Sequence, residues 1–100
     1  MGKRMTIAEQ IIRGLYILTI INHKDTFTRL DLRNALKIDK FTWNASFNPV
    51  FQALRIDEPG RAPLVREALI GLIKRTSYGV YKLTPKGKDI VNKYPKRGDR

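Results

Sequence analysis

The stretch Gly71-Leu-Ile-Lys-Arg-Thr-Ser-Tyr-Gly-Val-Tyr-Lys-Leu-Thr-Pro-Lys-Gly-Lys88 carries the clearest structural pattern in this chain of 100 residues. Two runs rich in β-branched and aromatic residues, 72–75 and 80–84, flank a polar segment, 76–79. Such an arrangement predicts a β-hairpin with a four-residue loop, in which Gly79 is free to take a positive φ.

A helix is expected directly after this hairpin. Thr84 can cap it, and Pro85 suits the first helical position because its missing N–H costs nothing there. The helix should cover residues 86–94 and end at Pro95. The phrase GLI-K-R followed by Y-K-L-T-P-K-G resembles the wing and following helix of winged helix-turn-helix proteins, as found in MarR-like and archaeal regulators. That resemblance implies nucleic-acid binding.

The N-terminal segment predicts a long helix with an unusually wide apolar surface. Thr6 and Glu9 form a capping box that opens a helix over residues 7–22. Isoleucines and leucines recur at three- and four-residue steps, and further apolar residues widen the stripe to a second face. We expect that surface to exceed what a small core covers, so the sequence predicts a homodimer through Ile7–Ile21 and the C-terminal helix.

The middle of the chain predicts the first helix of a helix-turn-helix. Residues 26–27 are expected to form a short strand, and Thr28 with Asp31 repeats the capping pattern before a helix over 29–37. The expected apolar side includes Leu30. The phrase Thr28-Arg-Leu-Asp-Leu-Arg-Asn-Ala-Leu36 is similar to the usual first helix of that motif.

Two segments compete as the helix that enters a DNA groove. Residues 43–57 have one apolar face, with a regular helix expected from Pro49 to Asp57 after an irregular start. Residues 63–70 also have helical spacing and lie directly before the hairpin. In the winged-helix family a single helix both follows the turn and precedes the wing. The sequence therefore does not decide which of the two segments enters the groove.

Side chains suited to DNA lie on both candidate helices and on the hairpin. Amide groups pair with adenine and guanidinium groups with guanine in the major groove, whereas lysines and hydroxyls bind phosphates. The candidate DNA-binding residues are Asn44, Asn48, Gln52 and Arg55 on the first helix, Arg61 and Arg66 near the second, and Lys74, Arg75, Thr76, Ser77, Tyr78 and Lys82 on the hairpin.

The composition points to a polyanionic partner. The chain carries 20 lysine and arginine residues against nine acidic residues, a net charge of +11, and the pI is near 10.4. Residues 1–73 hold eleven basic and seven acidic side chains, whereas residues 74–100 hold nine and two, so the net charges are +4 and +7. A field of this sign, concentrated on the hairpin and the C-terminal end, attracts phosphates.

Other classes of function find little support. The absence of cysteine excludes disulfides and cysteine-ligated zinc. The single histidine, His23, has no nucleophile or paired carboxylate near it in the sequence, so we expect no enzymatic activity, catalytic residue, metal or cofactor. The longest apolar run, residues 15–21, is too short to span a bilayer, and we expect no membrane partner.

We therefore expect an α+β winged helix-turn-helix domain over residues 1–94, with three to four helices and a two- or three-stranded β wing, followed by a flexible basic tail at 95–100. The expected function is non-catalytic binding of double-stranded DNA by a transcriptional regulator in the cytoplasm, associated with the nucleoid. Two alternatives remain: a DNA-reading domain of a restriction or nuclease machine, and a winged helix that binds RNA or protein.

Overall fold

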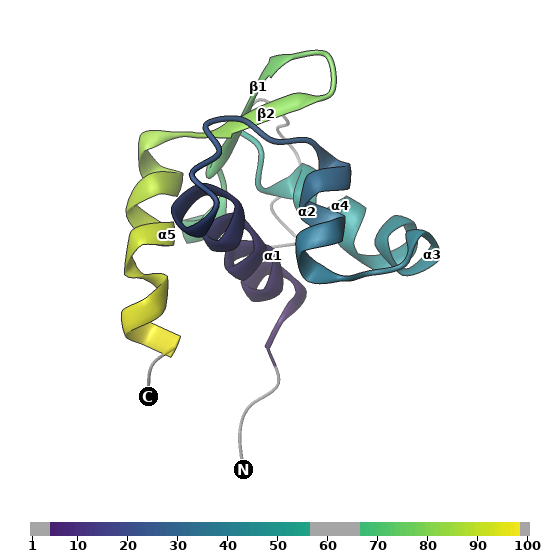
Figure 1. The fold of residues 1–100 in the computed structure, drawn as a ribbon, viewed down its shortest axis with the longest axis horizontal. Helices are drawn as coiled ribbons and strands as arrows, with labels where there is room; N and C mark the ends of the chain where they lie inside the picture. Colours follow the sequence, from purple (N-terminus) through teal and green to yellow (C-terminus); the bar gives the residue numbers. More distant parts are fainter. Residues whose placement is uncertain (1–4, 57–66, 99–100) are drawn as a thin grey trace.

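The structure is a computed structural model that describes residues 5–56 and 67–98 (Figure 1). Within them lie four helical rods and a two-stranded antiparallel sheet, an α+β arrangement consistent with a winged-helix layout. The elements are α1 (Ile7–Tyr16) with a π-helical continuation (Ile17–Ile21), α2 (Arg29–Leu36), α3 (Lys40–Thr42) continued by a π-helical turn (Trp43–Phe47) into α4 (Asn48–Ala53), a 3-10 turn (Glu67–Leu69), β1 (Ile73–Ser77), β2 (Val80–Leu83) and α5 (Pro85–Gly98).

Helix α1 is the central rod of the fold. The predicted capping box is confirmed, since the Thr6 hydroxyl accepts a bond of 3.1 Å from the Glu9 N–H while the Glu9 carboxylate accepts one of 2.9 Å from the Thr6 N–H. The helix contacts α2, α4 and α5. Its apolar side is buried against them at Ile11, Leu15 and Leu18.

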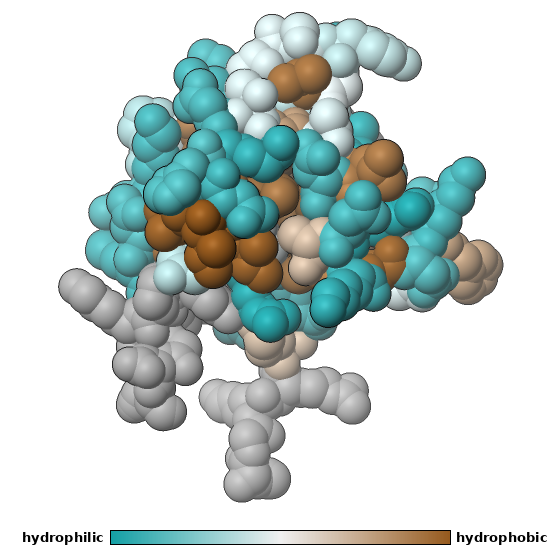
Figure 2. All heavy atoms as spheres, in the orientation of Figure 1, coloured by the Kyte–Doolittle hydropathy of each residue, from teal (hydrophilic) through white to brown (hydrophobic). Residues whose placement is uncertain are grey.

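Most of the apolar surface that predicts a dimer is therefore covered within one chain. Ile20 and Ile21, at the end of the π-helical continuation, stay 37% and 56% exposed. Figure 2 shows an apolar patch over α1 within a face that is otherwise largely hydrophilic.

Helix α2 is followed by a short turn and then by the next helical rod. The second capping box is confirmed, with bonds of 3.0 Å in both directions between Thr28 and Asp31. Lys37 then takes a left-handed conformation (φ 57°) and ends α2. Leu30, expected on the apolar side, is instead 55% exposed, because the buried contact of this short helix is made by Leu32.

The next rod begins earlier and ends earlier than predicted. The irregular start is confirmed as a π-helical turn over Trp43–Phe47, and the regular helix α4 begins at Asn48 with Pro49 in its first turn. The expected end at Asp57 is wrong, because α4 ends at Ala53, and helical structure also extends back to Lys40. Proline removes a hydrogen bond and crowds the preceding turn. Here a π-helical turn, in which the Asn48 N–H bonds the Trp43 carbonyl, widens the rod just before Pro49 and accommodates the ring.

This rod ends where a long-range contact begins. The Leu54 carbonyl accepts bonds of 2.9 Å from the N–H groups of both Gly71 and Leu72. Arg55 then forms a parallel bridge with Ile73. The second candidate reading segment, 63–70, lies mostly outside the described residues, as do Arg61 and Arg66; its last part holds the 3-10 turn Glu67–Leu69.

The predicted hairpin is confirmed, but the loop between its strands is shorter than expected. Thr76 and Ser77 belong to β1 rather than to a four-residue loop, a bulge falls between Arg75 and Ser77, and Gly79 has the expected positive φ of 74°. The short strand expected at 26–27 is confirmed as a bridge between Phe27 and Tyr81, with bonds of 2.9 and 2.8 Å.

Helix α5 starts as predicted and is longer than predicted. The Thr84 hydroxyl accepts a bond of 3.1 Å from the Gly87 N–H and donates one of 2.5 Å to the Gly71 carbonyl. Pro85 is the first helical residue. The expected end at Pro95 is wrong, because the helix continues to Gly98, so the first part of the expected flexible tail is helical.

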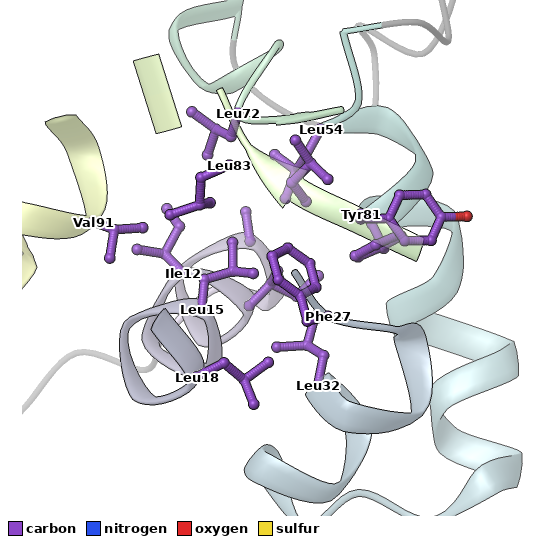
Figure 3. Close-up of a cluster of buried hydrophobic side chains, with 14 of the residues drawn as sticks. Ile12, Leu15, Leu18, Phe27, Leu32, Leu54, Leu72, Tyr81, Leu83 and Val91 are labelled. Carbon is purple, nitrogen blue, oxygen red and sulfur yellow. The ribbon is translucent and has the colours of Figure 1, made fainter. Parts of the chain in front are cut away.

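A single apolar core joins these elements (Figure 3). Phe27, Leu32 and Leu54 meet α1 from one side, and Leu83 and Val91 meet it from the other. None of the described helices has the length and apolar character needed to cross a membrane.

Candidate nucleic-acid interface

The rod Lys40–Ala53, which we call the reading helix, has a sharply divided surface. Its buried side consists of Trp43, Phe47 and Phe51. The Trp43 ring stacks on that of Phe47 and is tilted against that of Phe51, with centroid distances of 6.0 Å in both pairs. Its exposed side is concentrated in the first two turns, which carry Lys40, Phe41, Asn44 and Ala45. The rings therefore anchor the helix in the core and leave its N-terminal half open to a partner.

On the reading helix, Asn44 and Phe41 are exposed side chains of kinds that contact base edges. Asn44 is exposed, as a base-contacting amide requires. Phe41 is 80% exposed, which is unusual for a large apolar side chain. Sequence reasoning missed Phe41 because it placed the start of the helix after this residue; the indication was Asp39, a capping residue directly before it.

Asp39 fixes that start. Its carboxylate accepts a bond of 3.0 Å from the Thr42 N–H, which is one of the orphan donors at the beginning of a helix. Hydrogen bonds from Thr42, first from its side chain and then from its backbone, lower the pKa of the Asp39 carboxyl below the ordinary value. The cap thus holds Lys40 and Phe41 at the exposed end of the reading helix.

Asn48, further along the reading helix, is only half exposed. Its Oδ1 atom is buried and has no hydrogen-bond partner among the described residues. The side chain therefore lies at the edge of the exposed surface rather than at its centre.

Gln52 and Arg55 face other parts of the protein. Arg55 is 8% exposed, and its guanidinium donates a bond of 3.0 Å to the Gln52 side-chain oxygen. The same oxygen accepts a bond from Arg29 of α2. Two residues predicted to contact bases are thus joined to each other and to α2 inside the protein.

Aromatic rings complete this arrangement, which we call the arginine cluster (Arg29, Gln52, Arg55, Phe51 and Tyr81). The Arg29 guanidinium lies 5.0 Å from the Phe51 ring centre and 5.2 Å from that of Tyr81, and the Arg55 guanidinium lies 5.3 Å from that of Tyr81. Phe51 and Tyr81 meet edge to face at 5.1 Å. The cluster therefore links α2, the reading helix and β2 through cation–π and aromatic contacts.

The hairpin, by contrast, presents its predicted residues to solvent. Lys74, Arg75, Thr76, Ser77 and Tyr78 are all exposed, and Tyr78 at the turn is 91% exposed. In Figure 1 the hairpin projects from the body, away from the two termini. These groups are accessible to a partner of any sequence, as phosphate contacts require.

Two details of the hairpin favour an anion. The Arg75 guanidinium lies 5.8 Å from the Tyr78 ring centre, which holds this charge near the turn. Half-buried Lys82 is the cross-strand partner of Lys74. Like charges placed directly opposite each other destabilise a strand pair, so an anion bound between them would relieve the repulsion.

The described residues offer no grouping of side chains for a metal site. His23 is exposed, in a left-handed turn (φ 57°). Over residues 5–56 and 67–98, no group of three or more histidine, cysteine or acidic side chains is placed to hold a metal ion. The comparisons add no relative: no protein family, no curated protein and no solved structure matches this chain.

Proposed function

We propose that this protein is a non-catalytic double-stranded DNA-binding protein of the winged-helix kind and acts as a transcriptional regulator in the cytoplasm, on the nucleoid. The observation that carries the proposal is the pairing of an exposed N-terminal half of the reading helix with an exposed basic hairpin, joined through the arginine cluster. The N-terminal residues of a recognition helix are those that reach base edges in a helix-turn-helix complex.

The reading helix is the rod Lys40–Ala53 in this proposal. It follows α2 after the short turn that Lys37 opens, which is the chain order of a helix-turn-helix. Asn44 suits adenine, and Phe41 suits the methyl group of thymine. Lys40 adds a charge for the neighbouring phosphate.

The hairpin is the second contact in this proposal. Lys74, Arg75 and Lys82 supply charge, and Thr76 and Ser77 supply hydroxyl groups for phosphate oxygens. Such contacts raise the affinity for every sequence alike, whereas the helix adds the preference for particular base pairs.

A salt titration tests the proposal directly. Engagement of roughly five to eight phosphates predicts a log–log slope of about −4 to −7 for duplex DNA affinity against salt. Replacing Lys74 and Arg75 together by alanine should weaken binding to all sequences about equally and reduce the magnitude of that slope by nearly two. The matched control is Arg13→Ala with Lys93→Ala, which removes the same charge from exposed positions away from the hairpin.

The outcomes are distinct. A response that is flat in salt would remove the electrostatic basis of the proposal, and equal losses in the test and control variants would show that only net charge matters. A parallel titration with duplex RNA separates the RNA-binding alternative, because the deep and narrow major groove of RNA does not admit the reading helix. Tighter binding to RNA than to DNA would overturn the proposal.

A further inference from the structure

A cavity of about 320 Å³ lies outside the proposed DNA-contacting surface of the reading helix. Its walls come from the π-helical end of α1 and the loop after it, from β2 and from α5. The lining residues are Thr19, Ile20, His23, Lys24, Asp25, Lys82, Leu83, Lys88, Val91 and Asn92. This volume falls at the lower end of the range for small-molecule sites.

Three lysines line the cavity, together with a single acidic residue. Lys24, Lys82 and Lys88 come from three separate segments, and Asp25 is the one acidic residue in the lining. Lys24 is already engaged, since its ammonium lies 3.8 Å from Asp31. No ion pair between described residues involves Lys82 or Lys88, so two positive charges at one cavity lack a carboxylate partner there.

The rest of the lining divides into an apolar and a polar part. Ile20, Leu83 and Val91 are apolar; Ile20 is 37% exposed, whereas Leu83 and Val91 belong to the core that lies beneath the cavity. The Asn92 amide can donate hydrogen bonds to a ligand. A ligand that satisfies both parts needs a negative head group and an apolar body.

We propose that this cavity binds a small amphipathic organic anion, whose carboxylate or phosphate group is held by Lys82 and Lys88 and whose apolar body lies against Ile20. Charge-assisted hydrogen bonds from lysine favour such a head group over a neutral one. The inference stands apart from DNA binding, but Lys82 belongs to both surfaces. A bound anion therefore neutralises one hairpin charge and weakens phosphate contacts.

The test uses the full chain without DNA and a matched set of probes. Amide chemical shifts are followed while octanoate, octanamide, acetate or inorganic phosphate is added. Octanoate should give saturable shifts at residues that line the cavity, and neutral octanamide of the same shape should bind at least about tenfold more weakly. Acetate and inorganic phosphate, which lack the apolar body, should also bind more weakly than octanoate.

Variants locate the site. Lys82→Gln with Lys88→Gln should weaken octanoate binding at least about tenfold. The control Lys93→Gln removes the same kind of charge from α5 at a position that pairs with Asp89 at 3.2 Å and does not line the cavity. It should change octanoate affinity less than about twofold. The amide spectrum of each variant reports whether the fold is intact.

Each contrary result overturns the inference while leaving the DNA titration untouched. Equal affinity for octanoate and octanamide would show an apolar cavity without an anion site. Phosphate binding as tight as octanoate binding would show that the apolar wall takes no part. Equal losses in the lysine variants and the control would show unspecific attraction, and an absence of saturable shifts up to about 10 mM would show that no site exists.

Discussion

Gly87 lets α5 lie directly against the backbone of Leu72, just before β1, because its side chain is only a hydrogen atom. A Cβ atom at this position would overlap the backbone carbonyl of Leu72, which cannot move as a flexible side chain could. The same helical turn is fixed by Thr84, whose hydroxyl bonds both Gly71 and Gly87. The position therefore tolerates no side chain without displacement of α5.

We predict that Gly87→Ala lowers the free energy of unfolding by about 2–3 kcal/mol, although alanine is the better helix former. Lys88→Ala, at the exposed neighbouring position, is the control and should change stability by less than about 0.5 kcal/mol. Urea denaturation followed by Trp43 fluorescence measures both. An alanine variant as stable as the original chain would mean that α5 does not pack as described.

Phe41 carries the second prediction at this scale. Its exposed ring gains contact with a thymine methyl group in the proposed complex, so Phe41→Ala should cost about 1 kcal/mol on a preferred duplex selected from random sequences. On the same duplex with deoxyuridine in place of thymine, the variant and the original chain should bind alike. Ile56→Ala, at another exposed apolar position, is the control.

An equal loss on both duplexes would show that Phe41 contacts something other than the methyl group. Direct binding measurements at one fixed salt concentration keep this comparison free of the electrostatic contribution.

Single residues also show where the sequence suffices and where it does not. The caps at Thr6, Thr28 and Thr84 depend on neighbours within three residues, so their pattern is legible without a structure. The roles of Gln52 and Arg55 depend on Arg29, which lies 23 residues before Gln52. A helix-face pattern cannot reveal such a partner, so both residues were predicted to face DNA.

At the scale of elements, too, features set by nearby residues could be predicted from the sequence, whereas features of the reading helix set by distant residues could not. The hairpin and the start of α5 followed from local turn and cap chemistry. The end of the reading helix did not, because it is set by bonds between Leu54 and the segment at Gly71, and its start was hidden by Pro49, which a π-helical turn accommodates. Long-range pairing and a widened turn leave no short-range pattern in the sequence.

The cap of the reading helix predicts a dependence on pH. Because hydrogen bonds lower the pKa of Asp39 in the folded chain, the ionised carboxylate stabilises the fold above the ordinary pKa of about 3.9. That contribution is lost as the pH falls through the lower folded-state value. Asp39→Asn keeps a capping side chain that does not titrate, so stability should fall less steeply between about pH 5 and 2.

Urea denaturation at several pH values gives this slope for the original chain and the variant. Asp39→Ala removes the cap as well as the titration, and it should be less stable than Asp39→Asn across the whole range. An unchanged slope in Asp39→Asn would show that other carboxylates carry the acid sensitivity.

At the scale of the whole molecule, the homodimer stays a prediction, and less exposed apolar surface supports it than the sequence suggests. Ile11, Leu15 and Leu18 are buried within one chain, so a two-fold contact through α1 and its π-helical continuation has Ile21, 56% exposed, as its most accessible apolar side chain. We expect light scattering at micromolar concentration to show a dimer, and Ile21→Ser to dissociate it by placing a hydroxyl group in an apolar contact. A monomer with an intact fold in the original chain would contradict the prediction.

The bridge between Phe27 and Tyr81 has a mechanical consequence. Tyr81 is bonded through its backbone to the segment before α2, and its ring meets Phe51 of the reading helix. These links set the spacing between the hairpin and the reading helix. In the proposed complex, a duplex whose grooves do not fit that spacing would have to bend or widen, at an energy that depends on its sequence. The protein would then discriminate between base pairs that no side chain touches.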